Sequence, residues 1–97
     1  MDIHKPIQRH HAVRGMDSRV KRAIYRAHHR GTKEMDLILG RFADAEIGRF
    51  GDAEMAEFEA LLMLPDPQID RWIKGEEPPP GVMSMIVRIR RFHGVEH

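Results

Sequence analysis

Glycine and proline divide this chain into short segments, and their positions constrain the fold more than any other feature of the sequence. Gly31, Pro65 and Gly75 each follow a stretch whose apolar residues recur at helical spacing. Glycine commonly ends a helix because it adopts positive φ without a Cβ clash, and proline cannot continue one. Residues 76–81, Glu-Glu-Pro-Pro-Pro-Gly, are expected to form an extended strap. The positions of these glycines and prolines therefore predict short helices joined by tight corners.

Five segments between these breaks repeat apolar residues at intervals of three and four, as one face of a helix does. Their expected starts are a cap by Asp17 or Ser18, an opening near Thr32, a cap by Asp52, a restart at Asp66-Pro67 and a start near Val82. The first helix should end at Gly31, the second should fray between Gly48 and Gly51, and the fifth should run to about His93. The expected buried faces are Val20, Ile24 and Ala27; Met35, Ile38, Leu39, Phe42 and Ala45; Met55, Phe58, Leu61 and Leu62; Ile69, Trp72 and Ile73; and Val82, Met85, Ile86 and Ile89. No segment alternates like a strand, so the sequence predicts an all-α fold, a compact five-helix bundle with short connections.

Length and composition limit the chain to one core. Its 97 residues, 32% of them charged, can fold alone but cannot enclose a large substrate cavity. Residues 1–16 lack apolar periodicity and are expected to form a flexible basic arm, which leaves residues 17–97 as a single helical domain. The chain has no cysteine, no secretory signal pattern and no apolar run near the roughly 20 residues that cross a bilayer. We therefore expect a cytoplasmic protein without membrane insertion.

Charge is distributed very unevenly along the sequence. Residues 1–33 carry nine Lys or Arg against two Asp, whereas residues 34–70 carry ten carboxylates against two Arg. Such an uneven distribution of charge indicates how binding partners are steered toward the protein, and it does not indicate the fold. The basic third, with Tyr25 as a base-stacking residue, suggests nucleic acid, but the acidic second and third helices would repel a phosphate backbone. We therefore expect no nucleic-acid partner.

The segment from Arg30 to Asp36, Arg-Gly-Thr-Lys-Glu-Met-Asp, is the strongest candidate for a functional site. It places a cation, a helix-ending glycine and two carboxylates at a corner between two helices. Arg30 at a helix C-terminus and Glu34 in the next first turn would each gain roughly 0.3–1 kcal/mol from the helix dipoles. On the residues alone, a well-made structural corner and a binding site for another protein both remain open.

Other polar residues do not form a pattern that carries chemistry. The pair His10-His11 lies in the expected flexible arm, and the adjacent His28 and His29 on a helix point about 100° apart. Both pairs are therefore interpreted as surface residues, and no metal site is expected. No acid, base and nucleophile converge at useful spacing, so we expect no enzyme activity. Trp72 is expected to anchor its short helix in the core rather than to form a ligand platform.

Three stretches in register with the corner carry a resemblance to a known family. They are Leu39-Gly40-Arg41-Phe42, then Leu61-Leu62…Pro65-Asp66, then Ile69…Trp72-Ile73…Gly75. Together with Arg30-Gly31-x-x-Glu34-x-Asp36 they resemble the succinate dehydrogenase assembly factor (flavinator) family, from about Val20 to Phe92. The resemblance implies a small five-helix protein that binds the flavoprotein subunit of succinate dehydrogenase, and in some members that of fumarate reductase. It also implies that the protein promotes covalent attachment of FAD to that subunit.

The resemblance further implies which residues meet the partner. Arg30, Gly31 and Glu34 match the contact surface of the family, and Asp36 completes the motif. His29 stands where many members have a second arginine. Arg30 is expected to donate charge-assisted hydrogen bonds to the partner, and Glu34 to accept them. The reacting histidine and the flavin would belong to the partner, so this chain would hold no stably bound cofactor. A monomer is expected, because it suits a surface that must stay free for the partner. The alternative is a general protein-interaction module, or one half of a regulatory pair, that uses the same corner.

Overall fold

The computed structural model describes residues 18–95, and within that range it contains five α-helices, one 3-10 turn and no strand. The first helix occupies residues 18–28 of the described range. It is followed by α2 (Lys33–Glu46), the turn η1 (Ile47–Arg49), α3 (Asp52–Leu62), α4 (Asp66–Ile73) and α5 (Pro80–Phe92). The predicted all-α five-helix fold is confirmed. The proposed arm at residues 1–16 and the cap by Asp17 lie outside the described residues.

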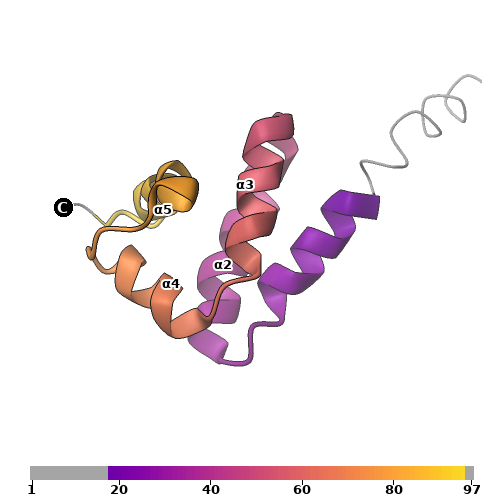
Figure 1. The fold of residues 1–97 in the computed structure, drawn as a ribbon. Helices are drawn as coiled ribbons and strands as arrows, with labels where there is room; N and C mark the ends of the chain where they lie inside the picture. The colour runs from indigo at the N-terminus through magenta and orange to yellow at the C-terminus, as the bar shows by residue number, and fades with distance from the viewer. Residues whose placement is uncertain (1–17, 96–97) are drawn as a thin grey trace, which may run out of the picture.

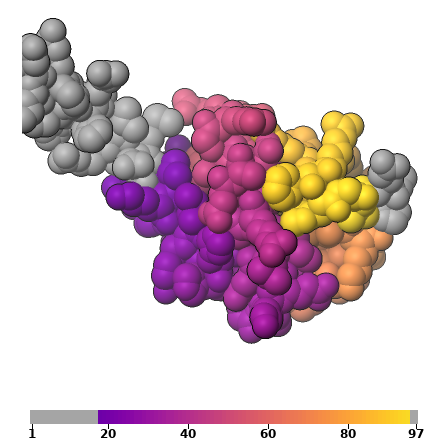
Figure 2. Space-filling view, turned by 180° about the vertical axis from the view of Figure 1, so that it is seen from behind, coloured from indigo at the N-terminus to yellow at the C-terminus, as the bar shows by residue number. Residues whose placement is uncertain are grey.

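The helices pack in a simple order across the molecule. In Figure 1, α2 and α3 lie in the middle, with helix 18–28 along one side and with α4 and α5 on the other. Figure 2 shows the same order from behind, with helix 18–28 in indigo and α5 in yellow at opposite flanks. The corner between helix 18–28 and α2 lies at the end of the molecule where α4 begins (Figure 1).

The core is aliphatic with an aromatic centre. Phe42 is fully buried, and its ring centroid lies 5.8 Å from that of Phe58, 6.1 Å from Phe50 and 5.7 Å from Phe92. Most residues of the predicted faces are buried, while Val20, Ile24, Ile38 and Trp72 are partly buried and pack against the core margin. The prediction that Trp72 serves the core is thereby confirmed.

The prediction for Ala45 is wrong. Ala45 is exposed and Ala43 is buried in its place. Positions i and i+2 of a helix point about 200° apart, so Ala43 and Ala45 cannot face the same side. Ala43, next to the buried Phe42, faces the core, and Ala45 faces solvent.

Helix boundaries account for the remaining differences. The first helix ends at residue 28 rather than at Gly31. The N-cap of α3 is Gly51 rather than Asp52, and the Glu54 carboxylate accepts a 2.8 Å hydrogen bond from the Gly51 amide. Pro80 and Gly81 were expected in the strap but begin α5. A proline at the first helical position lacks only an N–H that would have no helical partner, so the strap is shorter than predicted.

Candidate functional site

The corner between helix 18–28 and α2 owes its shape to two residues. Gly31 has φ +112°, a left-handed conformation that residues with a Cβ rarely adopt, which confirms the positive φ expected there. Thr32 then caps α2, because its hydroxyl oxygen accepts a 3.2 Å hydrogen bond from the Met35 amide. The chain therefore reverses within four residues and presents residues 29–34 at its tip.

The Arg30 side chain is directed inward. Its Nε donates to Oδ1 of Asp66 at 2.8 Å, and its two terminal nitrogens donate to the carbonyl oxygens of Leu62 at 2.7 Å and Leu64 at 2.8 Å. Only 9% of the side chain is exposed. The C-terminal carbonyls of a helix have no partner within it, and a cation is favoured there. Arg30 therefore caps the end of α3 and ties the corner to the α3–α4 connection, which differs from the expected outward contact.

Asp36 braces the same corner from α2. Its Oδ1 accepts a hydrogen bond from the backbone amide of Arg30, and the residue is half-buried. The corner is thus held by the Arg30 side chain, which reaches the α3–α4 connection, and by the Asp36 side chain, which holds the Arg30 backbone amide. Both are polar groups satisfied within the protein, as partly buried polar groups generally are.

His29, Gly31 and Glu34 form the outward side of the corner, where all three are exposed. The Nδ1 of His29 lies 2.7 Å from the carbonyl oxygen of Tyr25, and its ring stacks on the Tyr25 ring at 3.9 Å. A carbonyl can only accept, so Nδ1 is the donor and neutral His29 keeps Nε2 as an acceptor. Tyr25 is itself 63% exposed, so an aromatic pair adjoins the corner. Sequence reasoning did not assign Tyr25 to this site.

A hollow of about 360 Å³ opens beside Glu34. Thr32, Met35, Asp66, Pro67 and Asp70 line the rest of it. Oδ1 of Asp70 is buried without a hydrogen-bond partner among the described residues, while Oδ2 pairs with Nζ of Lys74 at 3.0 Å. The hydrogen bond that the Lys74 ammonium donates to Asp70 is the main cause that raises the pKa of Lys74 above its usual value. The hollow thus has three carboxylates on its walls.

His28 has a structural role close to the corner. Its Nε2 lies 3.0 and 3.1 Å from the two carboxylate oxygens of Asp44 on α2. The ring lies so close to Gly40 that an added Cβ would stand 2.5 Å from Nδ1 of His28. A glycine in the middle of a helix costs about 1 kcal/mol relative to alanine, and this is the sequence signal that could have revealed the contact.

Within residues 18–95, no group of three or more His, Cys, Asp or Glu side chains is placed to hold a metal ion. Nor does any helix in this range have the length and apolar character to cross a membrane. The geometry of the corner favours contact with a protein surface. It combines a rigid backbone turn, an exposed carboxylate and an exposed aromatic pair.

Comparison with known proteins finds one matching family and several similar curated proteins. The family described as "Flavinator of succinate dehydrogenase" matches residues 21–93. The chain is 36% identical over 63 residues to the FAD assembly factor SdhE of Acetobacter pasteurianus, covering 65% of this chain and 58% of the relative. It is 32% identical over 74 residues to the mitochondrial succinate dehydrogenase assembly factor 2 of Dictyostelium discoideum, covering 75% of this chain and 52% of the relative.

A third relative is the mitochondrial succinate dehydrogenase assembly factor 2 of Mycosarcoma maydis, 41% identical over 64 residues, which are 66% of this chain and 27% of the relative. The matched regions thus span only about half, or less, of the length of these relatives. No solved structure matches the chain significantly. The family match covers three quarters of the sequence and takes in the whole corner, so the chain belongs to the family of flavinators of succinate dehydrogenase.

Proposed function

We propose that this protein, as a cytoplasmic monomer, binds the flavoprotein subunit of succinate dehydrogenase and promotes covalent attachment of FAD to that subunit. The family match over residues 21–93 carries the proposal. The names of two relatives, a FAD assembly factor and a succinate dehydrogenase assembly factor, support the same client. The proposal includes no catalysis by this chain and no cofactor held by it. FAD and the group that bonds to it belong to the client.

The proposed client surface is the corner, and its five residues divide into two roles. Arg30 and Asp36 form the frame, since both are already bonded within the protein. His29, Gly31 and Glu34 form the contact face. A carboxylate such as Glu34, exposed and without a side-chain hydrogen bond or ion pair among the described residues, accepts charge-assisted hydrogen bonds from client donors.

Gly31 contributes an open face as well as a turn. A Cβ built at Gly31 meets no heavy atom within 4 Å, so none of the described residues covers the backbone on that side. A client backbone can therefore approach it closely. A side chain at this position would stand between the two proteins as well as strain the turn.

The mechanism we propose is positional. A client held against a rigid corner has fewer arrangements open to its reacting groups, and fixing two groups in a reactive geometry can remove several kcal/mol from a barrier. The acidic α2 and α3 surfaces add orientation and a faster encounter to the same contact. The protein would thus accelerate a reaction whose atoms all belong to the client.

The proposal is tested by covalent flavin fluorescence on the denatured flavoprotein subunit after co-expression with variants of this protein. Glu34→Ala should reduce the signal several-fold. Glu77→Ala, another exposed glutamate that lies outside the corner, should leave it unchanged. Full fluorescence with each of Glu34→Ala, Gly31→Ala and Arg30→Ala would show that the corner is not the client surface. The same assay with the fumarate reductase flavoprotein defines the client range.

A pull-down from cell lysate tests the client itself. Recovery of the flavoprotein subunit is the expected result. Recovery of unrelated proteins without it would favour a general interaction module instead.

A further inference from the structure

The helix at residues 18–28 presents a basic and aromatic face to solvent. It lies at one flank of the molecule (Figure 1 and Figure 2) and buries Ala23 and Ala27 on its inward side. Positions i, i+3, i+4 and i+7 share one side of a helix. Four exposed residues at this spacing form the outer face of the helix: Arg22, Tyr25, Arg26 and His29.

The two arginines of the outer face are available to a partner. Neither Arg22 nor Arg26 makes a side-chain hydrogen bond or an ion pair with the residues that the structure describes. Residues 18–28 carry four Lys or Arg and no Asp or Glu, so the helix supplies no carboxylate of its own. Any carboxylate that balances this charge must therefore come from a neighbouring helix or from another molecule.

The neighbouring carboxylates lie along the two edges of the outer face. On the edge toward α3, Glu59 accepts hydrogen bonds from Arg19 at 2.7 and 2.8 Å, and Asp52 also attracts Arg19. The arginines of the outer face attract Glu59 as well, so one carboxylate serves three guanidinium groups. On the edge toward α2, Asp44 lies 3.0 Å from Nε2 of His28. The outward side between these edges presents positive charge only.

The aromatic pair connects the outer face to the corner. The rings of Tyr25 and His29 are stacked, and His29 also belongs to the contact face of the corner. Neither the Tyr25 hydroxyl nor Nε2 of His29 has a hydrogen-bond partner among the described residues. Tyrosine and arginine are enriched among the residues that carry most of the binding energy at protein interfaces. The outer face therefore continues the contact face of the corner along the helix.

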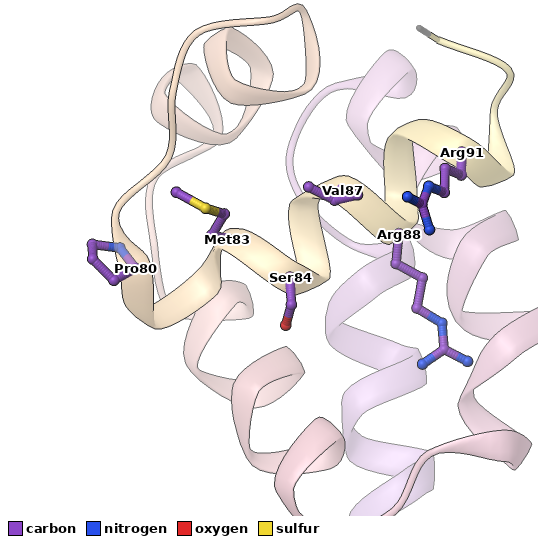
Figure 3. Close-up of a pocket in the computed structure, with 6 residues that line it drawn as sticks. All are labelled: Pro80, Met83, Ser84, Val87, Arg88 and Arg91. Atoms are coloured by element: carbon purple, nitrogen blue, oxygen red, sulfur yellow. The ribbon is translucent and has the colours of Figure 1, made fainter. Parts of the chain in front are cut away.

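The groove along α5 differs from the outer face, because its charges are mostly balanced within the protein. It has a volume of about 720 Å³, and Figure 3 shows the residues that line it. The Arg88 guanidinium pairs with Glu46 at 3.0 Å and with Glu54 at 2.9 Å. The Ser84 hydroxyl donates to the Glu57 carboxylate at 2.9 Å. The groove thus lacks the excess of unpaired cations that distinguishes the outer face.

We propose that the outer face of helix 18–28 binds an acidic segment of the client flavoprotein. Arg22 and Arg26 lie one turn apart, about 6 Å along the helix axis, so they fit two carboxylates with a similar separation. A guanidinium pairs with a carboxylate through two parallel hydrogen bonds. The stacked rings of Tyr25 and His29 would cover an apolar part of the same segment. The inference rests on the proposed function, because it assigns the same client a second contact that adjoins the corner.

Two other acidic occupants fit this face less well. In a second copy of this chain, most of the described carboxylates are already bonded, among them Glu46, Glu54, Glu57 and Glu59. A nucleic-acid duplex is wider than one helix, so its phosphates would also meet Asp44 and Glu59 at the edges. A segment that follows the helix between these edges meets neither repulsion.

The test measures the dissociation constant of the full chain and the purified flavoprotein subunit at low and high salt. Arg22→Gln combined with Arg26→Gln should weaken binding about ten-fold at low salt and much less at high salt. Tyr25→Ala should weaken binding about three- to ten-fold at both salt concentrations, because the contact of its ring is not ionic. Arg41→Gln combined with Arg91→Gln is the matched control, since it removes the same charge from exposed positions on α2 and α5. The control should change binding less than about two-fold.

Each outcome bears on the inference. All of these variants should keep the melting temperature of the unmodified protein, because the exchanged side chains are exposed. Unchanged binding by both outer-face variants, together with weaker binding by Glu34→Ala, would overturn this contact and leave the corner in place. Equal weakening by the control would reduce the effect to overall charge and would also overturn it. No binding of the unmodified protein to the flavoprotein subunit would overturn both proposals.

The other occupants are tested with the same double variant. Sedimentation of the full chain detects a dimer, and a gel shift with duplex DNA detects a nucleic-acid complex. If Arg22→Gln with Arg26→Gln dissolves either assembly and leaves binding to the flavoprotein subunit unchanged, the outer face belongs to that occupant and the client segment is overturned. A monomer that does not shift duplex DNA, with client binding weakened as stated, is the expected result.

Discussion

Replacing Arg30 with alanine should destabilise the whole protein, because the guanidinium links the corner to acceptors 32 to 36 residues along the chain. The change would leave Asp66, which is 17% exposed, without its ion-pair partner. It would also remove the donor from the Leu62 carbonyl at the end of α3 and from the Leu64 carbonyl in the connection to α4. Removing one partner of a buried pair costs about 3–5 kcal/mol, and the partial exposure of Asp66 favours the lower end, about 3 kcal/mol. For a domain of this size each kcal/mol lowers the melting temperature by about 4–8 °C, so a decrease of about 12–24 °C is expected.

Urea denaturation followed by far-UV circular dichroism and by the single tryptophan, Trp72, measures this loss. Arg30→Lys keeps the charge, but one ammonium cannot reproduce the planar fork that serves three acceptors, so it should be intermediate in stability. Arg41→Ala removes an exposed arginine from α2 and should change the free energy of unfolding by no more than about 0.5 kcal/mol.

The result that would refute this reasoning is specific. If Arg30→Ala unfolds at the same urea concentration as Arg41→Ala while flavin attachment is lost, the internal hydrogen bonds do not hold the corner. Arg30 would then act by direct contact with the client, as the resemblance implied.

Three further changes test the packing around the corner. Gly31→Ala forces a Cβ into φ +112° and should cost roughly 1–2 kcal/mol in thermal melting, and an unchanged melting temperature would contradict that backbone geometry. Gly40→Ala should lower the free energy of unfolding by roughly 1–3 kcal/mol, because its Cβ would overlap the His28 ring. In a His28→Ala background the same change should instead stabilise α2. A loss of stability in both backgrounds would exclude this overlap as the cause. The hydrogen bond that Arg19 donates is the main cause that lowers the pKa of the Glu59 carboxyl. The pair therefore stabilises the fold fully above the usual pKa of 4.5, and this contribution is lost as the pH falls through the lower pKa of the folded state. The difference in urea midpoint between the unmodified protein and Glu59→Gln should therefore shrink between neutral pH and about pH 3, and a constant difference would contradict it.

The sequence predicted what depends on local patterns. Gly31 predicted the positive-φ corner and Thr32 predicted the start of α2. The spacing of apolar residues predicted nearly every buried side chain. Each of these depends on residues within one or two helical turns. The failures at Ala45 and Pro80 were local as well, since each turned on one residue at the margin of an otherwise correct element.

What the sequence could not predict is where a long cationic side chain ends. Arg30 caps α3 from 32 residues away, and Arg90 caps α4 in the same manner by donating to the Trp72 carbonyl from Nε at 2.9 Å. Nothing in the sequence around either arginine identifies its acceptors, because these are backbone carbonyls that every residue possesses. Composition shows that a guanidinium is available, and only the packing of the helices decides which helix end receives it.

The distinction between a structural corner and a client contact therefore separates residues within one motif. A frame residue acts through the fraction of molecules with the corner in place, so flavin attachment and the urea midpoint of Arg30→Ala should fall together. A contact residue acts through affinity, so Glu34→Ala should reduce flavin attachment while it keeps the urea midpoint of the unmodified protein. Measuring attachment and the urea midpoint of both variants distinguishes the roles. A lowered midpoint for Glu34→Ala, or an unchanged midpoint for Arg30→Ala, would contradict the division, because a frame residue must act on the fold and a contact residue need not.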